Sequence, residues 1–413
     1  MSGTKKEKMK KIIVFLIFIF TSFNLSAQAY STSHYLYKFS PLAEIIVRNL
    51  GLEDKNANGV IDKGANEGYE GFIEKYGTGD TLEKKEKSID SGFYANYVIY
   101  GAGNSRLEEN EIVNYYYLNI RFKYPEETAI IDKEIKTYVY ANNLPLVWLD
   151  DEKGTVMKAV TKVLGEGWNE KQVTEDEAVN LLYKALQEIN IRGRQGLPSK
   201  NNGYYTLPEF TNKKYGYCLE LAQFGFWFFS ELKINSIFAW MDLTKSLRHE
   251  VIKLGSGKIV DYFNTSKNYN VPKDNWYVHN PMQVLSVFCS INERQSDRNV
   301  LNAETMLEQN VINDKYNIDN IVLLLHYHRR ANNNETVIEI GEFFLQNSDI
   351  DKILNKKHYA SSLVKEQIKV FLIYLLGSYH WINNRTGNDM IVSLLKKYYP
   401  NDNDVKDWIK AYN

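Results

Sequence analysis

One stretch of the sequence, residues 218 to 232, restricts the fold more than any other. It begins at Cys218 and is predicted to form a single helix with almost no polar face. A helix that is apolar on nearly all sides must be covered on nearly all sides by the rest of the chain. The side chains that give it this character are Leu221, Phe224, Phe226, Trp227, Phe228 and Phe229. We therefore expect this helix in the centre of a folded domain.

The composition of the 413 residues is that of a folded protein with more than one domain. Hydrophobic residues make up 44% and charged residues 24% of the chain, a balance typical of globular proteins. The 50 lysines and arginines nearly cancel the 51 aspartates and glutamates, so the net charge does not favour a polyanionic ligand. Nucleic acid is therefore not an expected partner, and the length suits two or three domains.

The first 29 residues have the layout of a secretory signal peptide. Lysines between Lys5 and Lys11 precede the uninterrupted apolar run from Ile12 to Phe20, and Ala27-Gln28-Ala29 supplies small residues at the cleavage positions. The apolar run is too short to form a stable membrane-spanning helix. We expect cleavage after about Ala29 and export to the periplasm, the cell surface or the medium. The alternative is an uncleaved membrane anchor.

Three regions are expected after the signal peptide. Residues 30–143 are mixed, residues 144–296 contain the long apolar helix, and residues 297–413 are helical throughout. The predicted fold class is α+β.

In the mixed region, Ser40-Pro41 combines a capping hydroxyl with a proline and predicts a helix start. Stretches rich in Tyr, Ile and Val favour strands at 97–100, 112–124 and 135–140, although 112–124 is equally consistent with a helix.

The middle region alternates helices with strands. Thr174 and Glu177 form a capping box that predicts a helix ending near Ile191, and residues 192–211 are expected to be a loop. Strands are predicted at Ile237–Met241, Arg248–Leu254 and Lys258–Phe263.

The last region is expected to contain paired helices separated by asparagine-rich turns. It resembles a tetratricopeptide-like helical array and would offer a surface to a protein partner. The predicted helices are Ile318–Arg330, Glu335–Gln346, Leu363–Trp381, Asp389–Tyr399 and Asp404–Tyr412.

Cys218 is the first candidate for chemistry. It begins its helix, where the helix dipole stabilises negative charge, and the thiolate is the reactive form of cysteine. Gly216 allows close approach of the backbone at this point. The amide groups of the first helical turn are also suited to stabilise an oxyanion.

The candidate base and its carboxylate partner lie on a predicted β-hairpin. His249 belongs to the first strand and Asp261 to the second. A three-residue loop at Gly255–Gly257 would make Asp261 the diagonal neighbour of His249 on the same face, about 7–8 Å away at the backbone. A two-residue loop would instead place the two side chains on opposite faces. Loop length therefore decides whether they can meet.

A helix that opens with Gly-x-Cys, followed by a strand with His and a strand with Asp, resembles the transglutaminase-like superfamily of papain-type thiol enzymes. The resemblance covers about residues 173–266. It implies that Cys218 is the nucleophile, His249 the general base and Asp261 the group that orients the imidazole. Substrates would be peptide or side-chain amides, and catalysis would require no cofactor.

In one respect this sequence departs from the family pattern, because Glu250 and Val251 follow the histidine where a small residue and an aromatic are usual. An upstream oxyanion donor is also implied, and the candidates are Gln195, Tyr204 and Tyr205.

Two alternatives compete with an enzyme. A cysteine in an aromatic helix is often a small buried hydrophobic residue, and the domain would then be a catalytically inactive scaffold that presents its helical region to a partner. A disulfide between Cys218 and Cys289 is also permitted in an exported protein, and it would remove the nucleophile.

Residues 54–62 match the first nine positions of an EF-hand-type calcium loop. The expected ligands are side-chain oxygens and one backbone carbonyl, supplied by Asp54, Asn56, Asn58, Val60 and Asp62. Position 12 is Ala65 instead of glutamate, which leaves Glu67 or Glu70 as substitutes. Residues 100–111, with Leu107 at position 8 and Glu111 at position 12, form a degenerate partner loop. The alternative is a turn rich in Asp and Asn without a metal.

Overall fold

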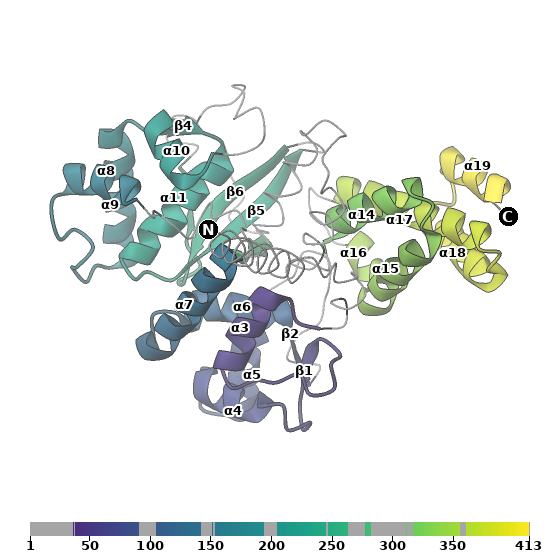
Figure 1. Ribbon diagram of the computed structural model, residues 1–413, viewed down its shortest axis with the longest axis horizontal. Helices are drawn as coiled ribbons and strands as arrows, with labels where there is room; N and C mark the ends of the chain where they lie inside the picture. Colours follow the sequence, from purple (N-terminus) through teal and green to yellow (C-terminus); the bar gives the residue numbers. More distant parts are fainter. Residues whose placement is uncertain are drawn as a thin grey trace, which may run out of the picture.

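The structure, a computed structural model, describes residues 36, 38–90, 105–141, 151, 153–193, 205–244, 247–262, 277–281, 311, 317–355 and 361–412. It is an α+β protein in which helices surround small sheets (Figure 1). The predicted signal peptide, the predicted strand at 97–100 and Cys289 lie outside these residues. Among the described helices, none is both long enough and apolar enough to cross a bilayer.

The N-terminal region consists of short helices around one two-stranded sheet, in which β1 and β2 pair antiparallel. Ser40 caps the first helix and Pro41 begins it, as the sequence predicts. The elements are α3 (Pro41–Asn49), β1 (Val60–Asp62), α4 (Tyr69–Tyr76), α5 (Leu82–Asp90), β2 (Arg106–Glu108), α6 (Glu109–Tyr115), the π-helix η2 (Tyr116–Ile120) and α7 (Pro125–Ala141).

One strand prediction in this region is wrong, because residues 135–140 belong to α7. For 112–124, which is consistent with either a strand or a helix by sequence, the structure shows a helix over residues 112–120, in α6 and η2. Every residue of α6 is buried, its two glutamates and two asparagines included, so polar residues do not mark an exposed face of this helix. In α7 the buried positions Thr128, Ile131, Ile135 and Val139 recur every three or four residues. That helical spacing outweighs the β propensity of the individual residues.

The middle region places one buried helix against an antiparallel sheet with strand order β7-β6-β5-β8. Helix α11 packs on β5 and β6, as Figure 1 shows. The elements are α8 (Thr155–Leu164), α9 (Glu175–Ile189), β3 (Arg192–Gly193), α10 (Leu207–Lys213), β4 (Tyr215–Gly216), α11 (Cys218–Glu231), β5 (Ser236–Thr244), β6 (Leu247–Leu254), β7 (Ile259–Val260) and β8 (Tyr277–His279).

Capping boxes begin two helices of this region, α9 and α10, and only the first of them was predicted from the sequence. The capping box of Thr174 and Glu177 begins α9, as predicted. The predicted loop at 192–211 is wrong at its end, because α10 begins at Leu207. Thr206 and Glu209 form a second capping box there, a pattern equivalent to the one at Thr174.

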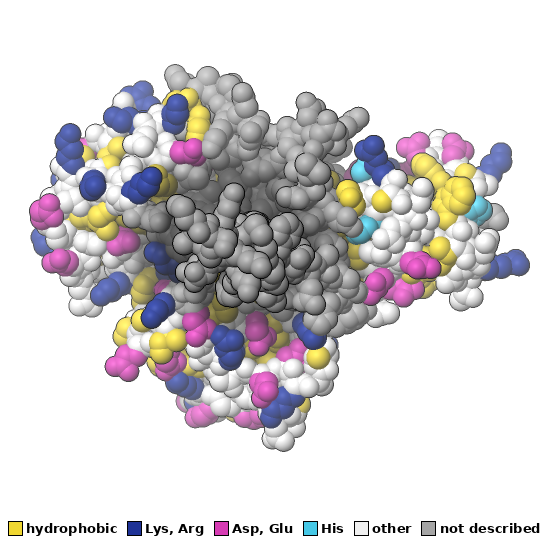
Figure 2. Space-filling model, in the orientation of Figure 1, with side chains coloured by type: hydrophobic (Ala, Val, Ile, Leu, Met, Phe, Trp, Pro, Cys, Tyr) yellow, Lys and Arg dark blue, Asp and Glu magenta, His cyan; other side chains and the backbone are white. Residues whose placement is uncertain are grey.

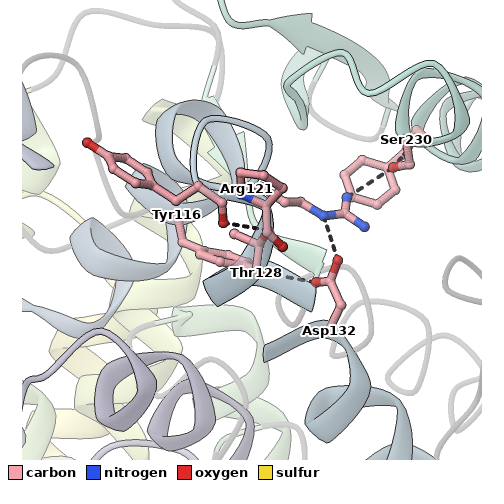
Figure 3. Close-up of polar contacts among 8 residues, drawn as sticks. Tyr116, Arg121, Thr128, Asp132 and Ser230 are labelled. Atoms are coloured by element: carbon pink, nitrogen blue, oxygen red, sulfur yellow. Dashed lines mark hydrogen bonds and ion pairs between the residues drawn. The ribbon is translucent and has the colours of Figure 1, made fainter. Parts of the chain in front are cut away.

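A single hydrophobic core, from Phe39 to Val278, includes residues of both regions. A partly buried polar contact joins them as well (Figure 3). The guanidinium of Arg121, directly after η2, donates to Asp132 Oδ2 of α7 at 3.3 Å and to Ser230 Oγ of α11 at 3.0 Å. The same guanidinium lies over the rings of Tyr117 and Phe226, 5.6 Å from each ring centroid. The N-terminal region is thereby fixed to the helix that begins at the candidate nucleophile.

The C-terminal helices form a second core of their own. The five predicted helices are present within a few residues of their predicted bounds, and the short helix α16 was missed. The long helix α17 packs against all the others in this group. The helices are α14 (Ile318–Arg330), α15 (Asn334–Asn347), α16 (Ile350–Asn355), α17 (Ser361–Trp381), α18 (Arg385–Tyr398) and α19 (Asn403–Tyr412). The resemblance to tetratricopeptide repeats stays a prediction.

Positive and negative side chains are interspersed over the described surface on the face drawn in Figure 2. This mixture agrees with the net charge of −1.

Candidate thiol site

Cys218 is the first residue of α11 and is partly exposed. Among the described residues it takes part in no disulfide. The backbone just before it is tightly packed: a Cβ added at Gly216 would come within 2.6 Å of Glu220 Oε2 and within 2.7 Å of the Phe210 ring. Glycine is therefore required at this position, as the sequence suggested.

The hairpin that carries the other two residues has the predicted register. Ile252 pairs with Val260 and Lys253 with Ile259, and Leu254 N–H donates to the Lys258 carbonyl oxygen at 2.9 Å. The loop is therefore the three-residue one. One position further along this register, Asp261 is opposite Val251 and diagonal to the residue at 249, on the same face of the sheet.

The side chains of His249 and Asp261 meet as this register predicts. His249 Nε2 lies 2.8 Å from Asp261 Oδ2, and both side chains are largely buried, with exposed fractions of 7% and 13%. The hydroxyl of Tyr183 on α9 donates to the Asp261 backbone carbonyl at 3.2 Å, which helps to hold this end of the hairpin.

The imidazole of His249 also hydrogen-bonds the side chain of Cys218. Burial lowers the pKa of His249, but the hydrogen bonds to Asp261 and Cys218 and their negative charges outweigh it and raise the pKa to about 10. The geometry therefore favours a protonated imidazole beside Cys218, and an adjacent cation is what activates a cysteine thiol.

The raised pKa of His249 predicts a pH-dependent stability. The folded state binds the imidazole proton more tightly than an unfolded histidine with pKa 6.5. This contribution to the free energy of unfolding is complete below about pH 6.5 and is lost as the pH rises toward about 10. We expect His249→Gln to flatten this part of the profile in urea titrations at a series of pH values. A wild-type slope that matches the variant throughout this range would contradict the ion pair.

One residue at the site was missed by sequence reasoning. Glu220, two residues after the cysteine, is fully buried and accepts hydrogen bonds from the backbone N–H groups of Tyr205 and Tyr217. Its position at N3 of a helix is typical of a capping box, but Tyr217 is not a usual N-cap residue, so the sequence pattern is incomplete.

Of the three candidates for the upstream oxyanion donor, Tyr205 has its backbone amide bonded to Glu220. The other two, Gln195 and Tyr204, lie outside the described residues. Glu250, where the sequence departs from the family pattern, is buried and lies opposite Trp240 on β5.

The candidate calcium loop is held by its own side chains. Asp54 Oδ1 and Oδ2 accept the backbone N–H groups of Asn58 and Gly59, and the side-chain amides of Asn56 and Asn58 both donate to Asp62 Oδ2. The side chains at positions 1, 3, 5 and 9 therefore converge.

Glu67, one of the two candidate substitutes for position 12, is buried against this loop. Its carboxylate accepts from the N–H groups of Lys55 at 3.1 Å and Asp62 at 2.7 Å. Glu70 instead bonds Gly64 N–H at an exposed position.

Residues 106–108 of the second loop pair with residues 60–62 of the first, while residues 100–104 lie outside the described residues. Ile61 and Leu107, the residues at position 8 of each loop, are direct partners in the β1–β2 sheet. Glu111, at position 12 of the second loop, accepts the Glu108 N–H at 2.9 Å. Within the described part of the chain, no three His, Cys, Asp or Glu side chains are grouped to hold a metal. A calcium ion in the first loop would therefore depend on asparagine and backbone oxygens as well.

The structure thus brings Cys218, His249 and Asp261 together at the head of α11. In a separate loop of the N-terminal region it gathers the side chains of Asp54, Asn56, Asn58 and Asp62. At the remaining predicted ligand of this loop, Val60, the backbone N–H donates to Asn58 Oδ1.

Comparisons of this chain with protein-family models, with curated proteins and with solved structures found no match.

Proposed function

We propose that this chain is an exported thiol enzyme with a transglutaminase-like core that cleaves or transfers acyl groups at peptide or side-chain amide bonds. The observation that carries the proposal is the buried imidazole of His249, hydrogen-bonded on one side to Cys218 and on the other to Asp261. Nucleophile, base and orienting carboxylate in contact are the arrangement that activates a thiol. The order of helix, strand and strand that carries them supports the transglutaminase-like assignment.

The roles follow from the contacts. The Cys218 thiolate attacks the amide carbonyl carbon, and the amides of the first turn of α11 stabilise the oxyanion. The His249 imidazolium then gives its proton to the leaving amine, so that the C–N bond breaks and a thioester remains on the sulfur. Asp261 keeps the ring oriented throughout. Neutral His249 next removes a proton from water, or from an acceptor amine, which attacks the thioester and releases the thiolate.

Hydrolysis is the favoured outcome, because water is always present as an acceptor. Export is part of the proposal and rests on the basic, apolar and small-residue pattern of residues 1–29.

A second candidate is a catalytically inactive scaffold that binds a protein through its C-terminal helices. Its support is the separate core of these helices, together with the exposed side chains of Trp381 and Trp408.

Alkylation of Cys218 in the native chain tests the proposal against the scaffold. We expect iodoacetamide to modify Cys218 rapidly at neutral pH, and the modification to depend on His249. A Cys218 that is inert in the folded protein would support the scaffold instead.

We further propose that the N-terminal loop at Asp54–Asp62 binds calcium as a structural ion. Pairing through short strands, here through Ile61 and Leu107, is the arrangement in which such calcium loops occur. Oxygens at Asp54, Asn56, Asn58, Asp62 and the Val60 carbonyl would hold the ion, and Glu67 is the nearest substitute for the missing ligand at position 12.

Calcium should therefore raise the melting temperature of the full chain relative to the same protein in a chelator. Binding to the folded state stabilises it by about 2.7 kcal/mol when free calcium is about a hundredfold above Kd. We expect Asp54→Ala to abolish the calcium-induced shift and Asp80→Ala, which removes an exposed aspartate before α5, to leave it unchanged. Thermal melts of the wild type that are identical with calcium and with chelator would exclude the site.

A further inference from the structure

Glu220 is a buried carboxyl group that the proposed reaction does not use. It lies on the first turn of α11 with no exposed surface. Within the described residues no lysine or arginine forms an ion pair with it. Burial raises the pKa of Glu220 to about 7, although the hydrogen bonds from Tyr205 and Tyr217 act in the opposite direction. A carboxylate kept in such a place costs stability, so its contacts call for an explanation.

The two carboxylate oxygens join two separate segments. Oε2 accepts the Tyr217 N–H at 2.5 Å, and Oε1 accepts the Tyr205 N–H at 2.7 Å. Hydrogen bonds from backbone amides to an ionised carboxylate are short and stronger than those between neutral groups. Tyr217 directly precedes the nucleophile, whereas Tyr205 belongs to the segment that leads into α10. One side chain therefore holds both segments in place.

The surrounding packing leaves this carboxylate little freedom. Gly216 makes room for it, since a Cβ there would come within 2.6 Å of Oε2. The hydroxyl of Tyr205 is itself hydrogen-bonded to Tyr215 on β4. The backbone of Gly216 pairs in parallel with Gly193 of β3. A change at Glu220 is therefore transmitted to the backbone that carries Cys218.

We propose that Glu220 is a positioning residue of the thiol site, whose carboxylate clamps the Tyr205 segment to the head of α11 and so fixes Cys218 in line with His249. The inference rests on the proposed function, because it assigns the clamp a role in the reactivity of Cys218. Both bonds require the ionised form. A protonated carboxyl group has only one unprotonated oxygen, and its O–H would face an N–H donor.

The clamp should therefore weaken as the pH falls through about 7, the pKa of Glu220. The titratable side chains nearest to the clamp are Tyr205, which Glu220 acts on, and Tyr215 on β4 and Glu209 on α10, which act on the same tyrosine. Burial raises the pKa of Tyr205, so this tyrosine does not titrate near neutrality. Glu209 is the other carboxyl group that acts on Tyr205, and a variant at that position separates its contribution.

The test compares iodoacetamide rate constants of Cys218 between about pH 5 and pH 9 in full-length variants. In Glu220→Gln, an amide N–H₂ replaces one of the two acceptor oxygens. We expect the alkylation rate constant above neutral pH to fall about tenfold or more. The inflection of the rate–pH profile near neutrality should also disappear. Glu177→Gln and Glu209→Gln remove the equivalent N3 carboxylates of α9 and α10. Both should keep the wild-type rate and profile.

A second measurement does not depend on whether the variant folds. Hydrogen exchange of the Tyr205 and Tyr217 amides in the wild type should show protection above neutral pH that falls as Glu220 is protonated. Constant protection of both amides across this range overturns the clamp, as does a Glu220→Gln variant that folds and keeps the wild-type rate and profile. If that variant keeps the rate while His249→Ala loses it, the inference fails and the proposed function stands. If His249→Ala keeps the rate, the proposed function itself fails.

Discussion

Replacing His249 with alanine should lower the alkylation rate of Cys218 by about a hundredfold or more at neutral pH, the size expected when a positioned acid–base group is removed. The imidazole contacts both Asp261 and Cys218, and its raised pKa of about 10 keeps it cationic near neutrality. Without it the sulfur loses the adjacent positive charge that favours the thiolate. Mass spectrometry of the full chain after timed exposure to iodoacetamide measures the rate at Cys218 directly.

A histidine elsewhere provides the matched control. His326 on α14 is exposed and bonds the Tyr374 hydroxyl at 2.8 Å, in the separate C-terminal core. His326→Ala should leave the alkylation of Cys218 unchanged. Equal rates in wild type and His249→Ala would mean that the imidazole does not activate the sulfur, and the enzymatic proposal would then be wrong. An alkylation rate in Asp261→Asn between those of the wild type and His249→Ala would show that the carboxylate acts on Cys218 through the imidazole.

The second large effect is expected at Arg121, where a charge is buried between the two regions (Figure 3). Breaking a buried ion pair by removing one partner costs about 3–5 kcal/mol. Asp132 is 39% exposed, so water can replace part of the contact that it loses. We therefore expect Arg121→Ala to lower the free energy of unfolding by about 3 kcal/mol, near the lower end of this range. Part of this loss is packing, since the guanidinium covers the rings of Tyr117 and Phe226.

Urea unfolding followed by circular dichroism measures this change, and two variants make the result specific. Arg121→Lys keeps the charge but loses the planar group that contacts Asp132 and Ser230 together, so it should recover only part of the stability. Arg48→Ala breaks a surface ion pair with Glu134; the Arg48 side chain is 59% exposed and the Glu134 side chain 40%. This variant should lose less than about 1 kcal/mol of unfolding free energy. Similar losses in Arg48→Ala and Arg121→Ala would show that the buried contact does not join the regions.

Where neighbours in sequence decide the structure, sequence reasoning succeeded. The capping box at Thr174 and the bounds of α14 follow from side chains within one helical turn and from apolar spacing along one face. The hairpin register follows from a three-residue loop, and it brings Asp261 onto the same face as His249. These features depend on local geometry, so a single sequence contains the information for them.

Long-range packing decided the rest. Helix α6 is buried on every side, and because its polar residues are buried too, they do not mark an exposed face that would reveal its helical period. The sequence alone did not indicate that Arg121 would meet Ser230, or that the Glu220 carboxylate would accept the amide of Tyr205 across a separate segment. Such contacts form only when distant segments have folded against one another and water has been excluded, because burial is what makes a polar group require a partner. The triad could be proposed from the sequence, but the clamp that holds its cysteine became visible only in the tertiary structure.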